Sequence, residues 1–188
     1  MKESAIRETI ARLALSLFQR GYTVGSSGNI SARIDDGLLI TPTNSCFGFL
    51  DPARISKLDA SGRHVGGDSP SKEIFLHQAF YETRKGTGAV VHLHSTHATA
   101  LSCLPGIDAD DAIPPLTPYV VMRVGRVKLV PYVRPGDPAM GDLIRALGGR
   151  YAAVLLAMRH GQIPPTAGYA EPDPDMPTID LVVDGPRA

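Results

Sequence analysis

The pair His92 and His94 constrains this chain more than any other feature, because both histidines follow an apolar run rich in β-branched residues. Residues 89–91 predict a buried strand that continues into the pair. Side chains alternate along a strand, so His92 and His94 share one face and Leu93 takes the other. Two imidazoles on one face can hold a transition metal, and a catalytic zinc takes about three protein ligands. His160 ends another apolar run and is the third candidate ligand, although a buried histidine with no metal role is the competing interpretation.

The composition favours a globular domain and excludes two classes of protein. The 188 residues carry 19 basic and 19 acidic side chains, so the basic excess of nucleic-acid and membrane-surface proteins is missing. The apolar runs are too short to cross a bilayer, and the N-terminus lacks a signal-peptide pattern. Cys46 and Cys103 form neither a disulfide framework nor a CxxC motif. We therefore expect a reduced, cytoplasmic protein with no nucleic-acid or membrane partner.

Hydrophobic periodicity predicts helices mixed with short strands. Residues 3–20 have helical spacing, and Ser69 and Pro70 predict the start of a helix that runs to about residue 84. Further helices are expected over residues 96–103 and 135–148. Strands are expected over residues 30–33, 38–41, 55–59, 63–65, 89–94, 120–124, 128–133 and 152–158. Short hairpins mixed with helices indicate an α/β domain with a largely antiparallel sheet.

The C-terminal segment has a different character from the rest of the chain. Residues 162–188 contain six prolines and no helical periodicity. This composition predicts a tail that is disordered or loosely draped over the surface.

Three segments of small and polar residues offer groups that can bind an anion. Residues 25–31 and 41–45 supply hydroxyls and backbone N–H groups, and Ser71 lies near a predicted helix N-terminus. Taken alone, each segment is better explained as a turn or a cap. Glu73, at the same helix start, either complements the helix dipole or performs chemistry.

Together these pieces match a known family. Its motifs here are Gly28-Asn29-Ile30-Ser31, Thr41-Pro42-Thr43, Ser69-Pro70-Ser71-Lys72-Glu73, His92-Leu93-His94-Ser95 and His160-Gly161. This ordered set resembles the class II aldolase/adducin superfamily over residues 1–161. The resemblance implies a three-layer α/β/α fold with a central, largely antiparallel sheet in residues 1–161. It ends near His160-Gly161, and residues 162–188 follow as an atypical proline-rich tail.

The resemblance also implies roles for individual residues. His92, His94 and His160 would bind Zn²⁺, or another divalent metal such as Mn²⁺ or Co²⁺, and Glu73 would be the catalytic acid/base. Tyr119 lies in the region of a tyrosine that reaches a neighbouring subunit's site in the aldolase branch. The substrate phosphate would be held by Ser27, Gly28, Asn29, Thr43, Asn44 and Ser71. Family members are usually four-fold symmetric, which implies a homotetramer.

Further segments narrow the implied activity. Residues 41–45, 114–119 and 121–126 resemble the branch that converts a 3-oxo-tetronate 4-phosphate into dihydroxyacetone phosphate and carbon dioxide. Loss of carbon dioxide from a β-keto acid leaves an enolate, which a divalent metal stabilises as a Lewis acid. Glu73 would protonate the enediolate afterwards. Lys72 either attracts the substrate carboxylate or is a solvated surface residue.

Two alternatives stay open at this stage. The same stabilisation serves retro-aldol cleavage, so the chain is also interpreted as a sugar-phosphate aldolase of the fuculose-phosphate type. A catalytically silent assembly module, as in adducin, is the alternative from another class. The retained His92, His94 and Glu73 weigh against the silent module, whereas the unusual tail weighs for it.

Overall fold

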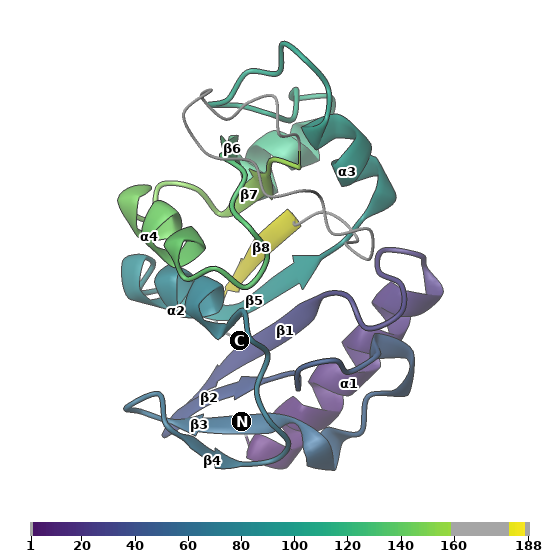
Figure 1. Cartoon of the computed structure of the whole chain (residues 1–188), viewed down its shortest axis with the longest axis vertical. Coiled ribbons are helices and arrows are strands. Elements are labelled where there is room, and N and C mark those ends of the chain that lie inside the picture. The colour runs from purple at the N-terminus through teal and green to yellow at the C-terminus, as the bar shows by residue number, and fades with distance from the viewer. Residues whose placement is uncertain (1, 159–180, 187–188) are drawn as a thin grey trace.

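The centre of the molecule is a mixed sheet that lies between two layers of helices (Figure 1). The computed structural model describes residues 2–158 and the backbone of residues 181–186. In chain order the elements are α1 (Glu3–Gln19), β1 (Asn29–Ile34), β2 (Gly37–Ile40), η1 (Phe47–Phe49), η2 (Pro52–Arg54), β3 (Ser56–Asp59), β4 (His64–Gly66), α2 (Ile74–Thr83), β5 (Thr87–Leu93), α3 (Thr96–Ser102), η3 (Val120–Val124), β6 (Val127–Val130), α4 (Ala139–Ala146), β7 (Ala153–Leu156) and β8 (Leu181–Pro186). Among these residues the strand order is β4-β3-β2-β1-β5-β8-β7-β6. Only the β6–β7 pair is parallel within the described sheet, so the expected largely antiparallel sheet is confirmed.

Helices cover both faces of the sheet because apolar side chains alternate along its strands. Leu38 and Ile40 of β2 pack in the core cluster that contains Leu76 of α2, and Leu39 between them packs with Ile10 of α1. Strand β7 divides its side chains in the same way between the α4 side and the α3 side. Figure 1 shows the resulting layers, with α2 and α4 on one side and α1 and α3 on the other. The three-layer α/β/α architecture is therefore the observed one.

Helix α2 begins later than the sequence predicts. Ser69 and Pro70 do not open the helix; Ile74 is its first residue and Glu73 is its N-cap. The reason is a tertiary contact, since Pro70 forms a β-bridge with Pro42 and holds the segment extended. The later start places Glu73 at the N-terminus of α2, three residues after the bridge between Pro70 and Pro42.

The segment 120–124 is a π-helical turn, η3, and the strand expected there was wrong. Its β-branched residues favour a strand by composition. The backbone N–H of Gly125 instead donates to the carbonyl of Val120 at 2.9 Å and closes the turn. Gly125 has a φ of +74°, a conformation that glycine adopts without strain, and the turn ends there.

Strand β8 corrects part of the expectation for the tail. Residues 181–186 pair antiparallel with β5 on one side and with β7 on the other, so this part is not loosely draped. Without β8, the facing edges of β5 and β7 would carry backbone groups in need of partners. Residues 181–183 are an apolar run with β-branched side chains, like the run that predicts β5, but the prolines of the tail led to the interpretation as a draped segment. The remainder of the tail lies outside the described residues.

Within the part of the chain that the structure describes, no helix combines the length and apolarity needed to cross a membrane.

Candidate active site

Two histidines lie at the end of β5, next to the first residue of β1. His92 is fully buried and is the register partner of Asn29 across the β1–β5 pair. His94 follows the last residue of β5 and is half-buried. Their rings stack with centroids 4.9 Å apart and an interplanar angle of 28°. The strand spacing therefore does bring the two imidazoles together, as the alternation of side chains predicts.

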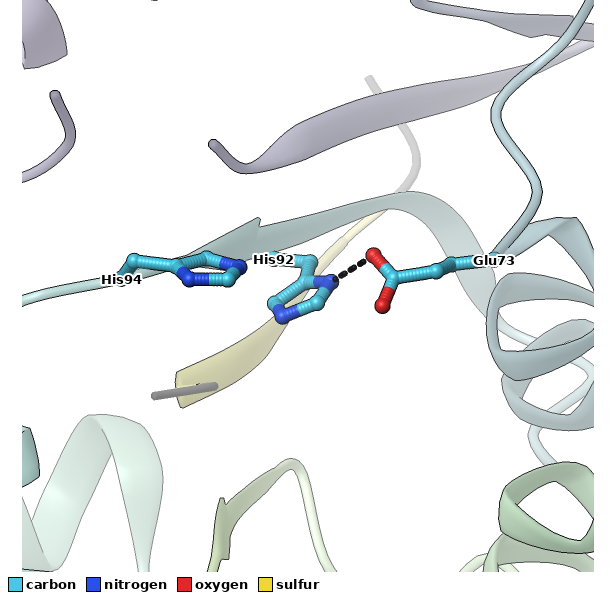
Figure 2. A group of neighbouring side chains, drawn as sticks. All are labelled: Glu73, His92 and His94. Carbon is cyan, nitrogen blue, oxygen red and sulfur yellow. Dashed lines mark ion pairs between the residues drawn. The ribbon is translucent and has the colours of Figure 1, made fainter. Parts of the chain in front are cut away.

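Glu73 completes a cluster with these histidines. Its Oε2 atom lies 3.0 Å from Nδ1 of His92, and Figure 2 shows the carboxylate directed at that ring. One potential ligand atom from each of Glu73, His92 and His94 lies within 4.8 Å of the others. Two imidazole nitrogens and a carboxylate oxygen form a donor set that suits a divalent transition metal. The residues present therefore fit the metal that the sequence implies, whereas His160 lies outside the described residues.

A glycine loop brings Asn29 against this cluster. Gly28 has a φ of +84°, and a Cβ at this position would lie 2.9 Å from the carbonyl oxygen of His92. Only glycine permits both the left-handed backbone and this close approach to β5. Asn29 follows it, is buried, and donates from Nδ2 to Oε2 of Glu73 at 2.7 Å. The loop thus contacts the proposed acid/base directly.

Behind Asn29 lies a second, fully buried histidine that sequence reasoning missed. Nε2 of His77 contacts Oδ1 of Asn29, and Nδ1 lies 2.7 Å from Oγ of Ser31. The hydroxyl of Tyr81 lies 2.8 Å from the same Oγ atom. The pKa of His77 is lowered to about 3, chiefly by burial; the nearby His92 contributes to this shift and Glu73 opposes it. His77 is therefore neutral at physiological pH. The available signal was its position four residues after Glu73, which places both on one face of a helix.

The three predicted anion-binding segments meet at the same end of the sheet. The backbone N–H of Thr41 donates to Ile30 at 2.9 Å, and the N–H of Ser71 donates to Thr41 at 3.3 Å. Ser71 is buried, and its Oγ accepts from the backbone N–H of Glu73 at 3.3 Å. The loops that carry Asn29, Thr41 and Ser71 are thereby joined to one another beside the Glu73 cluster.

Three of the residues predicted to hold phosphate, Ser27, Asn44 and Thr43, have other surroundings in the structure. The hydroxyl of Ser27 donates to the carbonyl of Val24 at 2.5 Å, so it stabilises its own loop. Asn44 is exposed and has a φ of +57°, a left-handed conformation that asparagine tolerates. Thr43 lines an open cavity of about 480 Å³ together with His64, Gly67, Asp68 and Ser69. This cavity does not include the Glu73 cluster.

Two cations lie near Glu73 in sequence or in space. Lys72 is exposed and directly precedes it. Arg134, which the sequence did not single out, lines a small pocket together with Glu73, Gly136 and Met140. The structure thus places Arg134 in a pocket with Glu73, whereas Lys72 is its neighbour in sequence.

Tyr119 is placed apart from the cluster. Its side chain is 75% exposed, and it precedes the π-helical turn η3. No hydrogen bond, ion pair or ring contact within the described residues joins it to Glu73, His92 or His94.

Comparisons with known proteins give the site its context. The family model "Class II Aldolase and Adducin N-terminal domain" matches residues 8–164. A 3-oxo-tetronate 4-phosphate decarboxylase of Cupriavidus necator is 53% identical over 154 residues, which cover 82% of this chain and 71% of the relative. L-fuculose phosphate aldolase of Escherichia coli is 32% identical over 166 residues, 87% of this chain and 74% of the relative. The crystal structure of Escherichia coli YgbL superposes with a TM-score of 0.84 at 45% identity. The superposition covers 97% of this chain and 79% of the YgbL chain.

Proposed function

This chain belongs to the class II aldolase and adducin family, and within it we propose a metal-dependent lyase that decarboxylates a 3-oxo-tetronate 4-phosphate to dihydroxyacetone phosphate and carbon dioxide. The observation that carries the proposal is the 53% identity to the decarboxylase of Cupriavidus necator over 82% of this chain. The 32% identity to L-fuculose phosphate aldolase is the observation behind the alternative, a sugar-phosphate aldolase. Both reactions break a carbon–carbon bond next to a carbonyl group and need the same kind of site.

The metal site is proposed to consist of His92, His94 and His160. The ion is proposed to be Zn²⁺, with Mn²⁺ or Co²⁺ as substitutes, because imidazole nitrogens suit these metals. When bound, such an ion supplies a Lewis acid that stabilises negative charge on the carbonyl and neighbouring hydroxyl oxygens of the substrate. The stacked His92 and His94 rings support the site because they are already held together by β5.

Glu73 is proposed as the residue that handles the proton. In the decarboxylation the bond between C1 and C2 breaks, carbon dioxide leaves, and the electron pair delocalises from C2 into the former C3 carbonyl. A proton must then reach C2 to give the hydroxymethyl ketone. Glu73 lies in the same cluster as the histidines. Once its carboxylate has taken up a proton from water, the carboxyl group is positioned to deliver that proton to C2 and returns to the carboxylate form.

The phosphate group is proposed to bind where the three loops meet. Ser27, Gly28, Asn29, Thr43, Asn44 and Ser71 would contribute. The joined backbones of the loops at Thr41 and Ser71 support this assignment, since they place several hydroxyls and N–H groups at one end of the sheet.

The carboxylate of the oxo acid would meet a cation. Lys72 is the proposed partner from the sequence, and Arg134 is the cation that shares a pocket with Glu73. A guanidinium binds a carboxylate in a bidentate manner, which the ammonium group of a lysine does not. We therefore expect Arg134→Ala to raise KM for the oxo acid more than Lys72→Ser does. An effect of Lys72→Ser alone would assign the role to Lys72, and equal effects would assign it to both cations.

The active assembly is proposed to be a homotetramer. Tyr119 and Met122 are each about three-quarters exposed, and a neighbouring copy of the chain would cover them. In this arrangement Tyr119 reaches the site of the next subunit. A cytoplasmic location, expected from the sequence, stays a prediction.

The deciding experiment measures two products from the metal-replete protein. The decarboxylase releases carbon dioxide from a 3-oxo-tetronate 4-phosphate, whereas the aldolase releases an aldehyde from a ketose 1-phosphate such as fuculose phosphate. Faster turnover of the sugar phosphate would overturn the proposal in favour of the aldolase. Metal analysis tests the silent assembly module, which is supported only if the protein retains no divalent ion after metal is added back.

A further inference from the structure

A chain of buried polar side chains leads from the interior of the protein to Glu73. It runs from the hydroxyl of Tyr81 through Ser31, His77 and Asn29, and its last link is the bond of 2.7 Å from Nδ2 of Asn29 to Oε2 of Glu73. The four side chains come from α2 and β1, which lie far apart in sequence. All four are buried, with exposed fractions of 7% or less.

The direction of every hydrogen bond in this chain follows from its end. A carboxylate only accepts, so Asn29 must present its NH₂ group to Glu73 and its carbonyl oxygen to His77. Nε2 of the neutral His77 ring must therefore carry the proton, and Nδ1 must accept from the hydroxyl of Ser31. The oxygen of Ser31 is then left to accept from Tyr81. All donors point towards the carboxylate of Glu73.

We propose that His77 is a positioning residue for the acid/base of this site. Its Nε2–H holds the Asn29 amide in the single orientation that donates to Glu73, and the amide turns the carboxylate towards His92, whose Nδ1 lies 3.0 Å from Oε2. The inference rests on the proposed function for the role of Glu73. It also limits the role of Asn29, because only one of its two N–H bonds remains for a substrate phosphate.

The test separates donation by His77 from simple packing in α2. His77→Gln keeps an N–H donor for Asn29, whereas His77→Leu removes it. Phe80→Leu is the matched control, because Phe80 is equally buried on α2 but packs only in the apolar core. We expect kcat to fall at least about tenfold in His77→Leu with KM nearly unchanged, and about threefold or less in His77→Gln and Phe80→Leu.

Three kinetic outcomes would overturn the proposal. The first is an unchanged kcat in His77→Leu. The second is an equal loss in His77→Gln, which would mean that the shape of the ring matters and its donor does not. The third is a change confined to KM, which would assign Asn29 to phosphate binding instead of to Glu73.

A structural readout judges the proposal independently of substrate. Crystal structures of the wild type and of His77→Leu should show the contact between Asn29 and Glu73 present in the first and broken in the second. If the wild type turns over neither substrate, the proposed function fails. The comparison of the two crystal structures still decides whether His77 positions Asn29 and Glu73. If His77→Leu does not fold, His77→Phe replaces it, since its ring fills the same buried space but has no N–H to donate to Asn29. An intact contact in His77→Phe would refute the proposal.

Discussion

The polar end of the sheet and the segment of residues 104–126 are built in opposite ways. At the sheet end, Asn29, Ser31 and His77 are buried and hydrogen-bonded to other side chains of the same chain. In the segment, large apolar side chains are exposed, namely Leu104, Leu116, Tyr119, Val121 and Met122. The first region is organised before any partner arrives, whereas the second leaves apolar surface for another surface to cover. The proposed chemistry lies in the self-sufficient region, and the proposed subunit contacts lie in the other.

The largest expected effect comes from removing a ligand at the sheet end. His92→Ala should lower the bound divalent metal strongly and reduce kcat/KM by at least about 100-fold, because a Lewis acid contributes several kcal/mol to such a reaction. Metal content by elemental analysis and product release measure the two effects. His97→Ala is the control, since His97 is an exposed histidine on α3, outside the Glu73 cluster. Normal metal content in His92→Ala would show that the metal does not bind at the cluster of Glu73, His92 and His94.

The next effect is a pH dependence that the buried histidine imposes. The pKa of His77 is lowered to about 3 in the folded state by burial, against about 6.5 in an unfolded chain. Between about pH 6.5 and pH 3, His77 therefore binds a proton in the unfolded state but not in the folded state. The stability contributed by the neutral ring is fully present above about pH 6.5 and is lost as the pH falls towards 3. Its slope reaches at most about 1.4 kcal/mol per pH unit.

Urea unfolding of the chelator-treated protein between pH 4.5 and 7.5 measures this slope. His77→Gln, which has no titrating group, should show a shallower decline than the wild type. Asp110→Asn is the counterpart from the exposed segment. A hydrogen bond from Lys128 holds the pKa of Asp110 below its usual value, and the group is exposed, so its removal should leave the slope over this range nearly unchanged. Identical slopes in all three proteins would contradict the burial of a neutral His77.

A third test compares two glycines with similar backbone angles. Gly28 has a φ of +84° and Gly106 a φ of +76°, but a Cβ at Gly106 would meet nothing within 4 Å. Gly106→Ala should therefore cost about 1 kcal/mol from the backbone alone. Gly28→Ala should cost about 1–3 kcal/mol more, because its Cβ collides with the carbonyl of His92. Equal losses in the free energy of unfolding would show that the Gly28 loop is not held tightly against β5.

The smallest effect on the fold itself is expected in the exposed segment. Met122→Glu should change the stability of the isolated subunit by about 0.5 kcal/mol or less, because its side chain is 76% exposed. The same change should weaken the proposed tetramer, which analytical ultracentrifugation measures. Val65→Glu on β4 is the matched control, an exposed apolar residue outside the segment. An undisturbed assembly in Met122→Glu would mean that this surface serves something other than subunit contacts.

Local patterns predicted most of the strands and the central pair of histidines. The apolar run before His92 and the alternation of side chains were sufficient for β5 and for the shared face of His92 and His94. The strands expected over residues 30–33 and 38–41 were likewise confirmed, as the hairpin of β1 and β2. These features are determined by residues adjacent in sequence.

The features that the sequence did not predict depend on distant partners. Pro70 would open a helix if it did not bridge to Pro42. The spacing from Glu73 could have singled out His77, but its contacts with Ser31 and Asn29 depend on β1 lying against α2, more than 40 residues away in sequence. Strand β8 depends on two neighbours that are themselves separated by much of the chain. Long-range pairing of this kind has no short sequence signature.

The central position of β8 also affects how the protein is made. Strands β4, β3, β2, β1 and β5 can pair in a continuous order as they leave the ribosome, and β6 and β7 can pair with each other. The described sheet joins these two groups only through residues 181–186, so a nascent chain that ends at residue 158 holds two partial sheets with open edges. Such edges attract other nascent chains, and we expect premature stop codons after residue 158 to yield aggregates instead of a smaller active enzyme.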